Sequence, residues 1–328
     1  MKIRIGIFGY GNLGRAAAFA VRAQEDMTLA GVFSRRDPEM IPDKVPDVPF
    51  FPATMLFGEN TPTKMDVLLL CGGSAQDLPA QTPVLARRFC VIDSFDTHAA
   101  ALAHFLRVEA AARAGDRLAF VSVGWDPGLF SLFRALSQAV LPSGESYTFW
   151  GYGVSQGHSE AIRHLSGVKA ARAYTIPCES MLAQVSAGER PAPARMLHHR
   201  LCFVVAEDGA NQAEIVREIQ AIPHYFKDDE TEVRFVTPET FLREHSALPH
   251  AGHVIRNGVC AQEAASAQMR FDLALASNPA FTGSILVAYA RALFRLYQRG
   301  ERGCRTVLDV PPALLLPMSA DDARKKFL

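Results

Sequence analysis

The sequence predicts a chain of the α/β class, with a doubly wound parallel sheet in an N-terminal domain and a second domain of the α+β class. Three observations lead to this prediction. The 328 residues are more than one hydrophobic core usually serves. Short apolar segments alternate with helical ones up to about residue 145. Beyond that point, longer strand-like segments follow one another with fewer helices between them.

The first elements form a βαβ unit. Residues 2–8 are expected to be a strand, residues 15–24 an alanine-rich helix and residues 29–33 a second strand. The unit has the usual length of about thirty residues. Residues 37–63 contain six prolines, so we expect irregular chain there with at most one short edge strand.

The alternation continues through the rest of this domain. Apolar strands are predicted at 66–71, 89–93 and 117–123, with a helix at 98–114 before the last of them. Strands that are apolar throughout are typical of a parallel sheet covered on both faces. Each of these strands ends in Gly, Ser or Asp, and ligands bind at this carboxyl edge of such sheets.

The second domain is predicted over residues 146–279, after an apolar helix at 129–140. Its expected elements are strands at 147–150, 173–176, 200–205 and 232–236, a helix at 211–221 and a surface loop at 184–193. Residues 280–299 form a long amphipathic helix whose inward face comprises Ile285, Leu286, Ala288, Tyr289, Ala292, Leu293 and Leu296. We expect residues 280–328 to pack back on the first domain, residues 1–145.

The composition argues against several classes of protein. Lys plus Arg total 34 and Asp plus Glu total 34, whereas general nucleic-acid or membrane-surface binders need a basic excess. No apolar run is long enough to span a membrane, and glycines interrupt the N-terminus before an export signal could form. The six cysteines are at least 19 residues apart, which indicates neither a disulfide framework nor a zinc site. We therefore expect a cytoplasmic protein.

A glycine motif, Gly9-x-Gly11-x-x-Gly14, directly follows the first strand and opens the first helix. In such motifs the first glycine permits a tight turn, the second lets the backbone approach a pyrophosphate, and the third allows close packing of helix on strand. The helix N-terminus then offers unpaired N–H groups to the phosphates. The placement predicts a Rossmann-type dinucleotide-binding domain.

The identity of the dinucleotide is indicated by Ser34, Arg35 and Arg36, about twenty residues beyond the motif. Chains that bind NAD place a carboxylate here for the ribose hydroxyls, and a carboxylate would repel a 2′-phosphate. A hydroxyl and two guanidiniums would instead bind that phosphate, so NADP is predicted. The alternative is a solvated basic turn, because Asp37 follows.

Carboxylates gather at the predicted sheet edge. Asp93 and Asp96 follow one strand, and Asp126 follows the next. Such groups suit a substrate ammonium, and one could act as a base in forming or hydrating an imine. Asp126 could alternatively be a plain helix N-cap. Arg200, at a strand entry, is either a carboxylate clamp or a surface residue.

One pair of histidines resembles half of a metal site. His250 and His253 have a spacing that could suit a metal ion, but no third ligand stands at a recognised spacing. No metal site is therefore predicted.

Together these segments resemble the meso-diaminopimelate D-dehydrogenase family. The residues that carry the resemblance run in order over nearly the whole chain: Gly-Tyr-Gly-Asn-Leu-Gly (9–14), Phe-Ser-Arg-Arg (33–36), Cys-Gly-Gly-Ser (71–74), Gly-Trp-Asp-Pro-Gly (124–128), Thr-Phe-Trp-Gly (148–151), Ser-Gln-Gly-His-Ser (155–159), Cys-Phe-Val-Val-Ala (202–206), Leu-Pro-His-Ala-Gly-His-Val-Ile (248–255) and Asn-Pro-Ala-Phe (278–281). The glycine motif occurs in many dehydrogenases, whereas the segments at 124–128 and 155–159 are much more specific.

The resemblance implies reversible, NADP-dependent oxidative deamination at the D-centre of meso-2,6-diaminopimelate. The products are L-2-amino-6-oxopimelate, which cyclises to tetrahydrodipicolinate, and ammonia. The reaction belongs to lysine biosynthesis, and the resemblance also suggests a homodimer whose second domain serves substrate binding and dimerisation.

The resemblance also implies roles for individual residues. The cofactor would be lined by Gly9, Tyr10, Gly11, Asn12, Leu13, Gly14, Ser34, Arg35, Arg36, Cys71, Gly72, Gly73, Ser74, Phe95, Asp96, Thr97, Gly124, Trp125, Pro127 and Gly128. The reacting D-centre would be met by Asp93, Trp125, Asp126, Trp150, Gln156 and Gly157, with Asp126 and Asp93 as the catalytic pair. The distal L-centre would be held by Thr175, Arg200, His250 and Asn278.

Two departures concern the wall next to the cofactor. Gly72 stands where the family is expected to have methionine, and residues 94–97 differ from the expected Thr-Tyr-Asp-Asn. A roomier pocket that admits other D-amino acids would be one consequence. The alternatives to this function are another two-domain NADP-dependent reductase or amino-acid dehydrogenase, and a non-catalytic NADP sensor.

Overall fold

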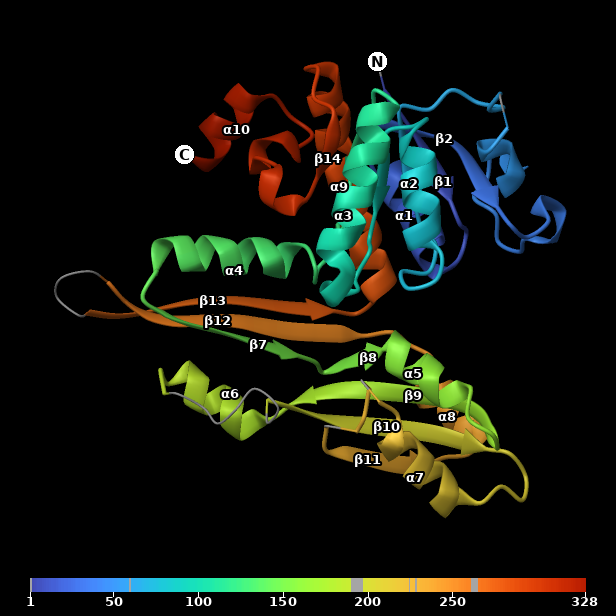
Figure 1. Cartoon of the computed structure of the whole chain (residues 1–328), viewed down its shortest axis with the longest axis vertical. Coiled ribbons are helices and arrows are strands. Elements are labelled where there is room, and N and C mark those ends of the chain that lie inside the picture. The colour runs from blue at the N-terminus through green and yellow to red at the C-terminus, as the bar shows by residue number, and fades with distance from the viewer. Residues whose placement is uncertain (1, 59, 190–196, 224, 228, 261–264) are drawn as a thin grey trace. The chain divides into compact units, whose positions relative to one another are not determined.

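The computed structural model describes residues 2–58, 60–189, 197–223, 225–227, 229–260 and 265–328 (Figure 1). Contacts between Cα atoms divide the chain into two compact units. The first unit comprises Met1–Leu132 and Pro279–Leu328, and the second comprises Phe133–Asn278.

A seven-stranded parallel sheet forms the centre of the first unit, which confirms the predicted fold class. The strand order is β14-β6-β5-β4-β1-β2-β3. Their bounds are β1 Ile3–Phe8, β2 Met27–Ser34, β3 Phe50–Pro52, β4 Val67–Leu70, β5 Val91–Asp93, β6 Leu118–Phe120 and β14 Gly303–Arg305. β3 is the short edge strand expected within the proline-rich segment. Leu68, Leu69 and Leu70 are fully buried because helices cover both faces of the sheet.

The helices of the first unit follow the predicted order. They are α1 Asn12–Arg22, α2 Leu78–Ala86, α3 Ala101–Ala114, α9 Asn278–Gln298 and α10 Ala320–Phe327, and α4 Leu129–Val140 begins in this unit. α2 and α3 pack on one face of the sheet through Leu85 and Val108. α9 lies against α1, since a Cβ atom built on Gly283 would be 2.8 Å from the Ala17 nitrogen.

The last fifty residues belong to the first unit. β14 pairs with β6 and so extends the sheet, although Gly-Cys-Arg has no strand-like pattern by itself. Six of the seven predicted inward residues of α9 are buried, whereas Ala288 is partly exposed. The charged Arg291 is buried on the same helix, which the apolar pattern did not indicate.

The described residues of the second unit form two sheets. The four-stranded sheet has the order β11-β10-β9-β8, and the three-stranded sheet has the order β13-β12-β7. The strands are β7 Gly144–Trp150, β8 Gly153–Ser155, β9 Val168–Pro177, β10 His198–Ala206, β11 Thr231–Phe235, β12 His250–Cys260 and β13 Ala265–Leu275. The helices are α5 Gln156–Arg163, α6 Glu179–Ser186, α7 Gln212–Ala221 and α8 Pro238–Glu244.

One predicted loop in this unit is partly wrong. Residues 184–186 end helix α6, and residues 190–193 lie outside the described part of the chain. The helix forms because Met181, Leu182 and Val185 recur at helical spacing and pack on Phe149 and Ile255. Among the residues that the structure describes, every helix is too short or too polar to cross a bilayer.

Candidate active site

The glycine motif forms the turn between β1 and α1. Gly9 has a φ of +97°, which favours glycine, and the Cys71 carbonyl lies close to it. A Cβ atom on Gly14 would be only 1.9 Å from the Gly9 oxygen. By contrast, a Cβ atom on Gly11 would have no atom within 4 Å. The packing of this protein therefore explains Gly9 and Gly14, whereas Gly11 leaves an open space at the start of the helix.

That contrast gives a prediction. Gly11→Ala should leave the free energy of unfolding of the cofactor-free protein within about 1 kcal/mol, because the backbone there (φ −86°) suits alanine. The same change should raise the dissociation constant of the cofactor about tenfold, the effect of losing roughly 1.4 kcal/mol of binding free energy. Calorimetric titration and thermal melts measure both quantities. Gly14→Ala is the matched comparison, and it should instead destabilise the fold by about 1–3 kcal/mol or more through overpacking. An unchanged dissociation constant for Gly11→Ala would contradict the placement.

The N-terminus of α1 suits an anion. Its N-cap is Gly11, no side chain caps it, and no acidic residue stands in the first turn. Such a helix end presents N–H groups and partial positive charge to a phosphate. The Tyr10 ring is buried, and its hydroxyl donates to the Asp43 carbonyl at 3.2 Å. Its side chain therefore holds a neighbouring loop.

The residues at the end of β2 that were predicted to bind the 2′-phosphate differ in their contacts and exposure. Arg35 forms two hydrogen bonds with the Asp77 carboxylate, at 2.7 and 3.0 Å, and is two-thirds exposed. Arg36 is also exposed and donates to the Tyr10 carbonyl, so its guanidinium lies beside the glycine motif. Ser34 is buried, and its hydroxyl accepts the Arg36 N–H at 3.1 Å. Ser34 thus orients Arg36, and the two guanidiniums are the accessible groups of the three.

In the loop after β4, Asp77 packs against Gly72 and Gly73. The Asp77 carboxylate accepts the Gly73 N–H at 2.8 Å, and a Cβ atom on Gly72 would lie 2.8 Å from the Asp77 Cβ. The space beside Gly72 is therefore filled by Asp77, which argues against the roomier pocket considered above. Burial raises the pKa of the Cys71 thiol to about 12, so this cysteine stays protonated at neutral pH.

The loop after β5 separates its two carboxylates. Asp93 is fully buried and accepts hydrogen bonds from Thr82, His104 and two backbone N–H groups. Asp96 and Thr97, three and four residues later, are exposed, and the Asp96 N–H donates to the Ser74 hydroxyl at 2.8 Å. The burial of Asp93 does not agree with the predicted direct contact with the substrate.

Phe95 also differs from a cofactor-facing wall residue. Its side chain is buried and stacks on the His104 ring, with 4.2 Å between ring centroids.

The turn that carries Asp126 is fixed by backbone contacts. The Leu129 N–H donates to the Gly124 carbonyl at 3.1 Å, and the Phe130 N–H donates to the Trp125 carbonyl at 2.8 Å. Asp126 and Pro127 are partly exposed, while Trp125 is buried with its ring edge-on to Phe130. The turn therefore presents the Asp126 carboxylate on a constrained backbone.

In the second unit the strand register brings the predicted distal residues together. Gly153 on β8 pairs with Thr175 on β9, and Thr175 pairs with Arg200 on β10. Arg200 donates to the Asp229 carboxylate at 2.7 Å and to the Thr175 hydroxyl. A Cβ atom on Gly153 would meet the His250 ring at 2.6 Å, so this ring lies against β8.

Trp150 joins the same region through His198. The Trp150 N–H donates to His198 Nε2 at 2.7 Å, and the two rings stack. Burial, helped by the Arg200 charge, lowers the pKa of His198 to about 4, and the same causes lower that of His158 to about 4. Both rings are thus uncharged at neutral pH, and Arg200 supplies the positive charge here.

The remaining predicted residues stand at helix starts. Gln156 and Gly157 begin α5 and are exposed, and Asn278 begins α9, where its N–H donates to the Leu248 carbonyl at 3.0 Å. His253 pairs with Asp272 and not with His250. Within the described part of the chain, no three His, Cys, Asp or Glu side chains are grouped as a metal site would need.

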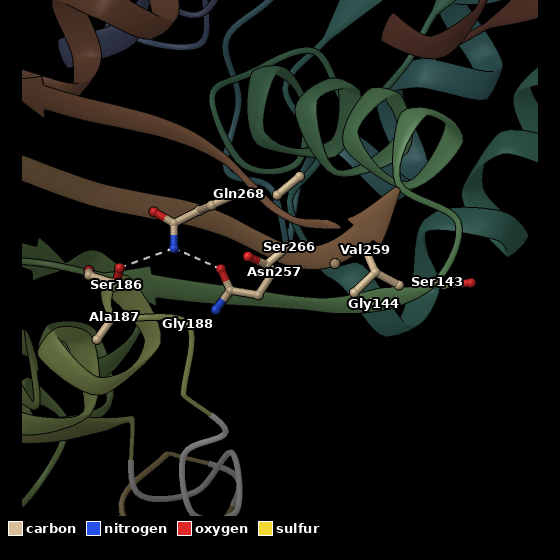
Figure 2. Close-up of a pocket in the computed structure, with 11 residues that line it drawn as sticks. Ser143, Gly144, Ser186, Ala187, Gly188, Asn257, Val259, Ser266 and Gln268 are labelled. Atoms are coloured by element: carbon tan, nitrogen blue, oxygen red, sulfur yellow. Dashed lines mark hydrogen bonds between the residues drawn. The ribbon is translucent and has the colours of Figure 1, made fainter. Parts of the chain in front are cut away.

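A cavity of about 800 Å³ lies elsewhere in the second unit, beside β7, β12, β13 and the end of α6 (Figure 2). Gln268 spans part of it by donating to the Ser186 carbonyl and to Asn257 Oδ1. Among the residues that the structure describes, its lining comprises Ser143, Gly144, Ser186, Ala187, Gly188, Asn257, Gly258, Val259, Ser266, Ala267 and Gln268, none of which is titratable.

Several residues of these networks were not singled out from the sequence. They are Thr82, His104, His158, His198 and Asp229. His198, adjacent to the predicted clamp, and His158, within the segment at 155–159, carried a signal. The other three did not, because contacts across strands or between strand and helix leave no fixed spacing in sequence.

Proteins of known function resemble this chain over its whole length. Residues 124–277 match the family described as the diaminopimelic acid dehydrogenase C-terminal domain. A relative from Ureibacillus thermosphaericus named meso-diaminopimelate D-dehydrogenase is 49% identical, over 100% of this chain and 99% of that protein. The solved structure of the C. glutamicum DAP dehydrogenase in complex with DAP has a TM-score of 0.91 and 40% identity, over 100% of this chain and 99% of that one.

A third similar protein has a solved structure with a cofactor bound. The structure of an engineered D-amino acid dehydrogenase bound to NADP+ has a TM-score of 0.87 and 38% identity, over 100% of both chains. Identity of this extent over the full length means that the chain belongs to the meso-diaminopimelate D-dehydrogenase family.

Proposed function

We propose that this protein catalyses the reversible, NADP-dependent oxidative deamination of meso-2,6-diaminopimelate at its D-centre. The products are L-2-amino-6-oxopimelate, the open form of tetrahydrodipicolinate, and ammonia. The observation that carries the proposal is the full-length identity of 49% to a protein named for this activity. The chemistry of the described residues supports it, since a substrate with an ammonium and a carboxylate at each end needs both signs of charge. Exposed Asp96 and partly exposed Asp126 provide one sign, and Arg200 provides the other.

NADP fits the first unit. The open space at Gly11 and the acid-free start of α1 suit a pyrophosphate, and the exposed Arg36 suits a 2′-phosphate. Bound NADP would accept the hydride from the D-carbon of the substrate. Residues at the carboxyl ends of β4, β5 and β6 would line the rest of the cofactor.

The preference for NADP gives a second prediction. Arg36→Ala should raise the KM for NADP about 10- to 100-fold, because a hydrogen bond between two charged groups is worth roughly 1.5–3 kcal/mol. The KM for NAD should change much less, because NAD lacks the 2′-phosphate. Arg107→Ala, another exposed arginine of the same unit, is the control. Equal increases for both cofactors would contradict the assignment of Arg36.

At the reacting centre we assign the substrate ammonium to Asp126 and Asp96. Asp93 was the predicted partner of Asp126, but Asp96 is the carboxylate of that loop with solvent access. Oxidation of the ammonium form removes a hydride from the D-carbon, which NADP would accept, and a proton from its nitrogen, which leaves an iminium ion. Water then adds to the iminium carbon, and the nitrogen leaves as ammonium as the carbonyl forms. In this proposal Asp126 would take the proton, and the residues around it would orient the D-carbon.

This role gives a third prediction. Asp126→Asn should lower kcat by about 100-fold or more, which is the usual contribution of a positioned proton acceptor. The dissociation constant for NADP should change by less than about threefold, because the residues assigned to the phosphates lie in the turns that follow β1 and β2. Steady-state kinetics and calorimetry give the two values, with the exposed Asp208→Asn as control. Unchanged turnover would exclude Asp126 as the acceptor.

The distal L-centre is assigned to the cluster in the second unit. Arg200 would bind its carboxylate, held in place by Asp229 and Thr175, and His250 and Asn278 would complete the contacts. Trp150, Gln156 and Gly157 would shape the pocket near the reacting centre. We also propose a homodimer, a cytoplasmic location and a role in lysine biosynthesis. In this proposal the second domain serves substrate binding and dimerisation.

The experiment that tests this function compares stereoisomers. NADP reduction is followed by absorbance with purified protein and the meso, L,L and D,D isomers of diaminopimelate in parallel. Rapid reduction with the meso isomer and little with the L,L isomer is expected. If NADP binds but no isomer is oxidised, the proposed function is wrong, and another reductase or a sensor becomes the better account.

A further inference from the structure

The buried Asp93 lies at the carboxyl end of β5, next to the parallel strand β6. It is the last residue of β5, and its carboxylate has no exposed surface. One oxygen, Oδ1, accepts the Phe95 N–H at 3.1 Å and the Ser122 N–H at 3.0 Å. Its backbone carbonyl also accepts the Val123 N–H at 2.9 Å. Asp93 therefore connects the chain after β5 to the chain after β6.

Those two segments carry the carboxylates assigned to the substrate. Asp96 directly follows Phe95, and the turn at 124–128 with Asp126 directly follows Val123. Ser122 has a φ of +56°, an uncommon conformation for a residue with a side chain. The bond from its N–H to Asp93 helps to hold that conformation, and with it the direction in which the turn leaves β6.

The other oxygen of Asp93 is held from the helices. Oδ2 accepts from the Thr82 hydroxyl on α2 and from His104 Nε2 on α3, both at 2.7 Å. His104 Nδ1 is buried and has no hydrogen-bond partner among the described residues, so the tautomer with a proton on Nε2 fits best. The His104 ring also stacks on Phe95. Side chains on α2 and α3 thus hold one oxygen of the Asp93 carboxylate, and the other oxygen holds the backbone that follows β5 and β6.

We propose that Asp93, held by Thr82 and His104, is a positioning residue that sets the turn carrying Asp126, and that it does not itself contact the substrate. The inference rests on the proposed function only in assigning Asp126 to the reacting amine. A displacement of about 1 Å in such a turn can lower turnover about 100-fold, because hydride transfer depends on alignment.

Paired substitutions at His104 test the proposal. His104→Phe keeps a ring to stack on Phe95 but loses the donor, and should lower kcat about 10- to 100-fold through misalignment of the turn. His104→Gln restores an N–H donor and should bring kcat back to within about threefold of the parent, although it loses the stack. The dissociation constant for NADPH should change by less than about threefold in both, because the residues assigned to the phosphates follow β1 and β2 and make no hydrogen bond to Asp93.

A matched control separates positioning from loss of stability. Val108→Ala removes buried volume one turn further along the same helix, without a polar contact to Asp93, and should lower the Tm with little loss of kcat. If His104→Phe does not fold, Thr82→Val removes a donor to the same oxygen at nearly the same volume. The proposal is overturned if His104→Phe, or Thr82→Val used in its place, keeps the parental kcat. It is also overturned if His104→Gln gives no recovery, or if Val108→Ala loses as much kcat at an equal fall in Tm.

A second readout needs no catalysis. The chain has two tryptophans, so Trp150→Phe leaves Trp125, within the turn, as the only one. In that background, His104→Phe should shift the Trp125 emission to longer wavelength, whereas His104→Gln and Val108→Ala should not. This result can be obtained even if meso-diaminopimelate is not a substrate, so it separates failure of the positioning role from failure of the proposed function. An unshifted emission in His104→Phe would overturn the proposal.

Discussion

Gly128→Ala is expected to abolish most turnover. A Cβ atom at this position would lie 1.6 Å from the Gly124 carbonyl oxygen, and the φ of Gly128 is +139°. Neither the clash nor the backbone conformation can be relieved by rotating a side chain, so the turn at 124–128 must open. Because Asp126 lies within this turn, we expect kcat to fall at least about 100-fold, the effect of roughly 1 Å of misplacement.

The control for this prediction is another glycine with positive φ. Gly300 has a φ of +90° but open space around its Cβ position, so Gly300→Ala carries the conformational strain without the clash. It should cost about 1–3 kcal/mol of stability and leave kcat unchanged. Kinetics at a temperature where both variants remain folded make the comparison. A Gly128→Ala enzyme with parental kcat would show that the turn does not set the position of Asp126.

Breaking the ion pair between Asp26 and Arg291 is expected to give the largest loss of stability. Arg291 on α9 is 2% exposed and binds both oxygens of Asp26, at 2.6 and 2.8 Å. It also donates to the Gln24 side chain and to the Leu315 carbonyl. This one guanidinium therefore ties the turn before β2 to α9 and to the C-terminal segment.

The two halves of the pair should not be equivalent. Asp26→Ala leaves a buried cation without its anion and should cost about 3–5 kcal/mol, as for buried pairs broken on one side. Arg291→Met should cost less, about 3 kcal/mol, because Asp26 is one-third exposed and water can solvate it. Chemical denaturation measures both values, and the exposed Arg324→Ala on α10 should stay within about 0.5 kcal/mol. An equal, small effect of both core substitutions would contradict this account.

The ion pair between Asp26 and Arg291 also makes the stability of the fold depend on pH. The hydrogen bond from Arg291 lowers the pKa of Asp26 below its ordinary value of 3.8. The unfolded chain therefore binds the proton more readily, and the stabilisation by Asp26 is complete above about pH 3.8 and is lost as the pH falls through the folded-state pKa. The difference in stability between the parent protein and Asp26→Asn should thus shrink below pH 3.8.

The fold could be predicted where the sequence pattern is local. The segments at 66–71 and 89–93 are apolar apart from Asp66 and Asp93 at their ends, and the structure places β4 and β5 within them. β14 could not be predicted, because its three residues are a strand only through pairing with β6. The hairpin of β12 and β13 was missed for a related reason. Its pairing extends along the whole of both strands, but β13 alternates partly buried with exposed positions and starts with alanine and serine, which favour strands weakly.

In the candidate site, too, only the features set by spacing along the chain could be predicted. The glycine motif and the position of Asp126 follow from spacing along the chain. Asp93 and Asp96 could not be separated in this way, because both follow the same apolar run and both carry a carboxylate. Their difference comes from Thr82 and His104 on two separate helices, which bury Asp93 and satisfy its oxygens.

The most direct test of the central claim follows the hydrogen that leaves the substrate. meso-Diaminopimelate carrying deuterium only at its D-carbon is incubated with the protein and NADP, and the reduced cofactor and amino-acid product are analysed by mass spectrometry. The account predicts that the deuterium appears in NADPH and is absent from the product. Unlabelled NADPH, with deuterium retained in the product, would show oxidation at the L-centre and contradict the account.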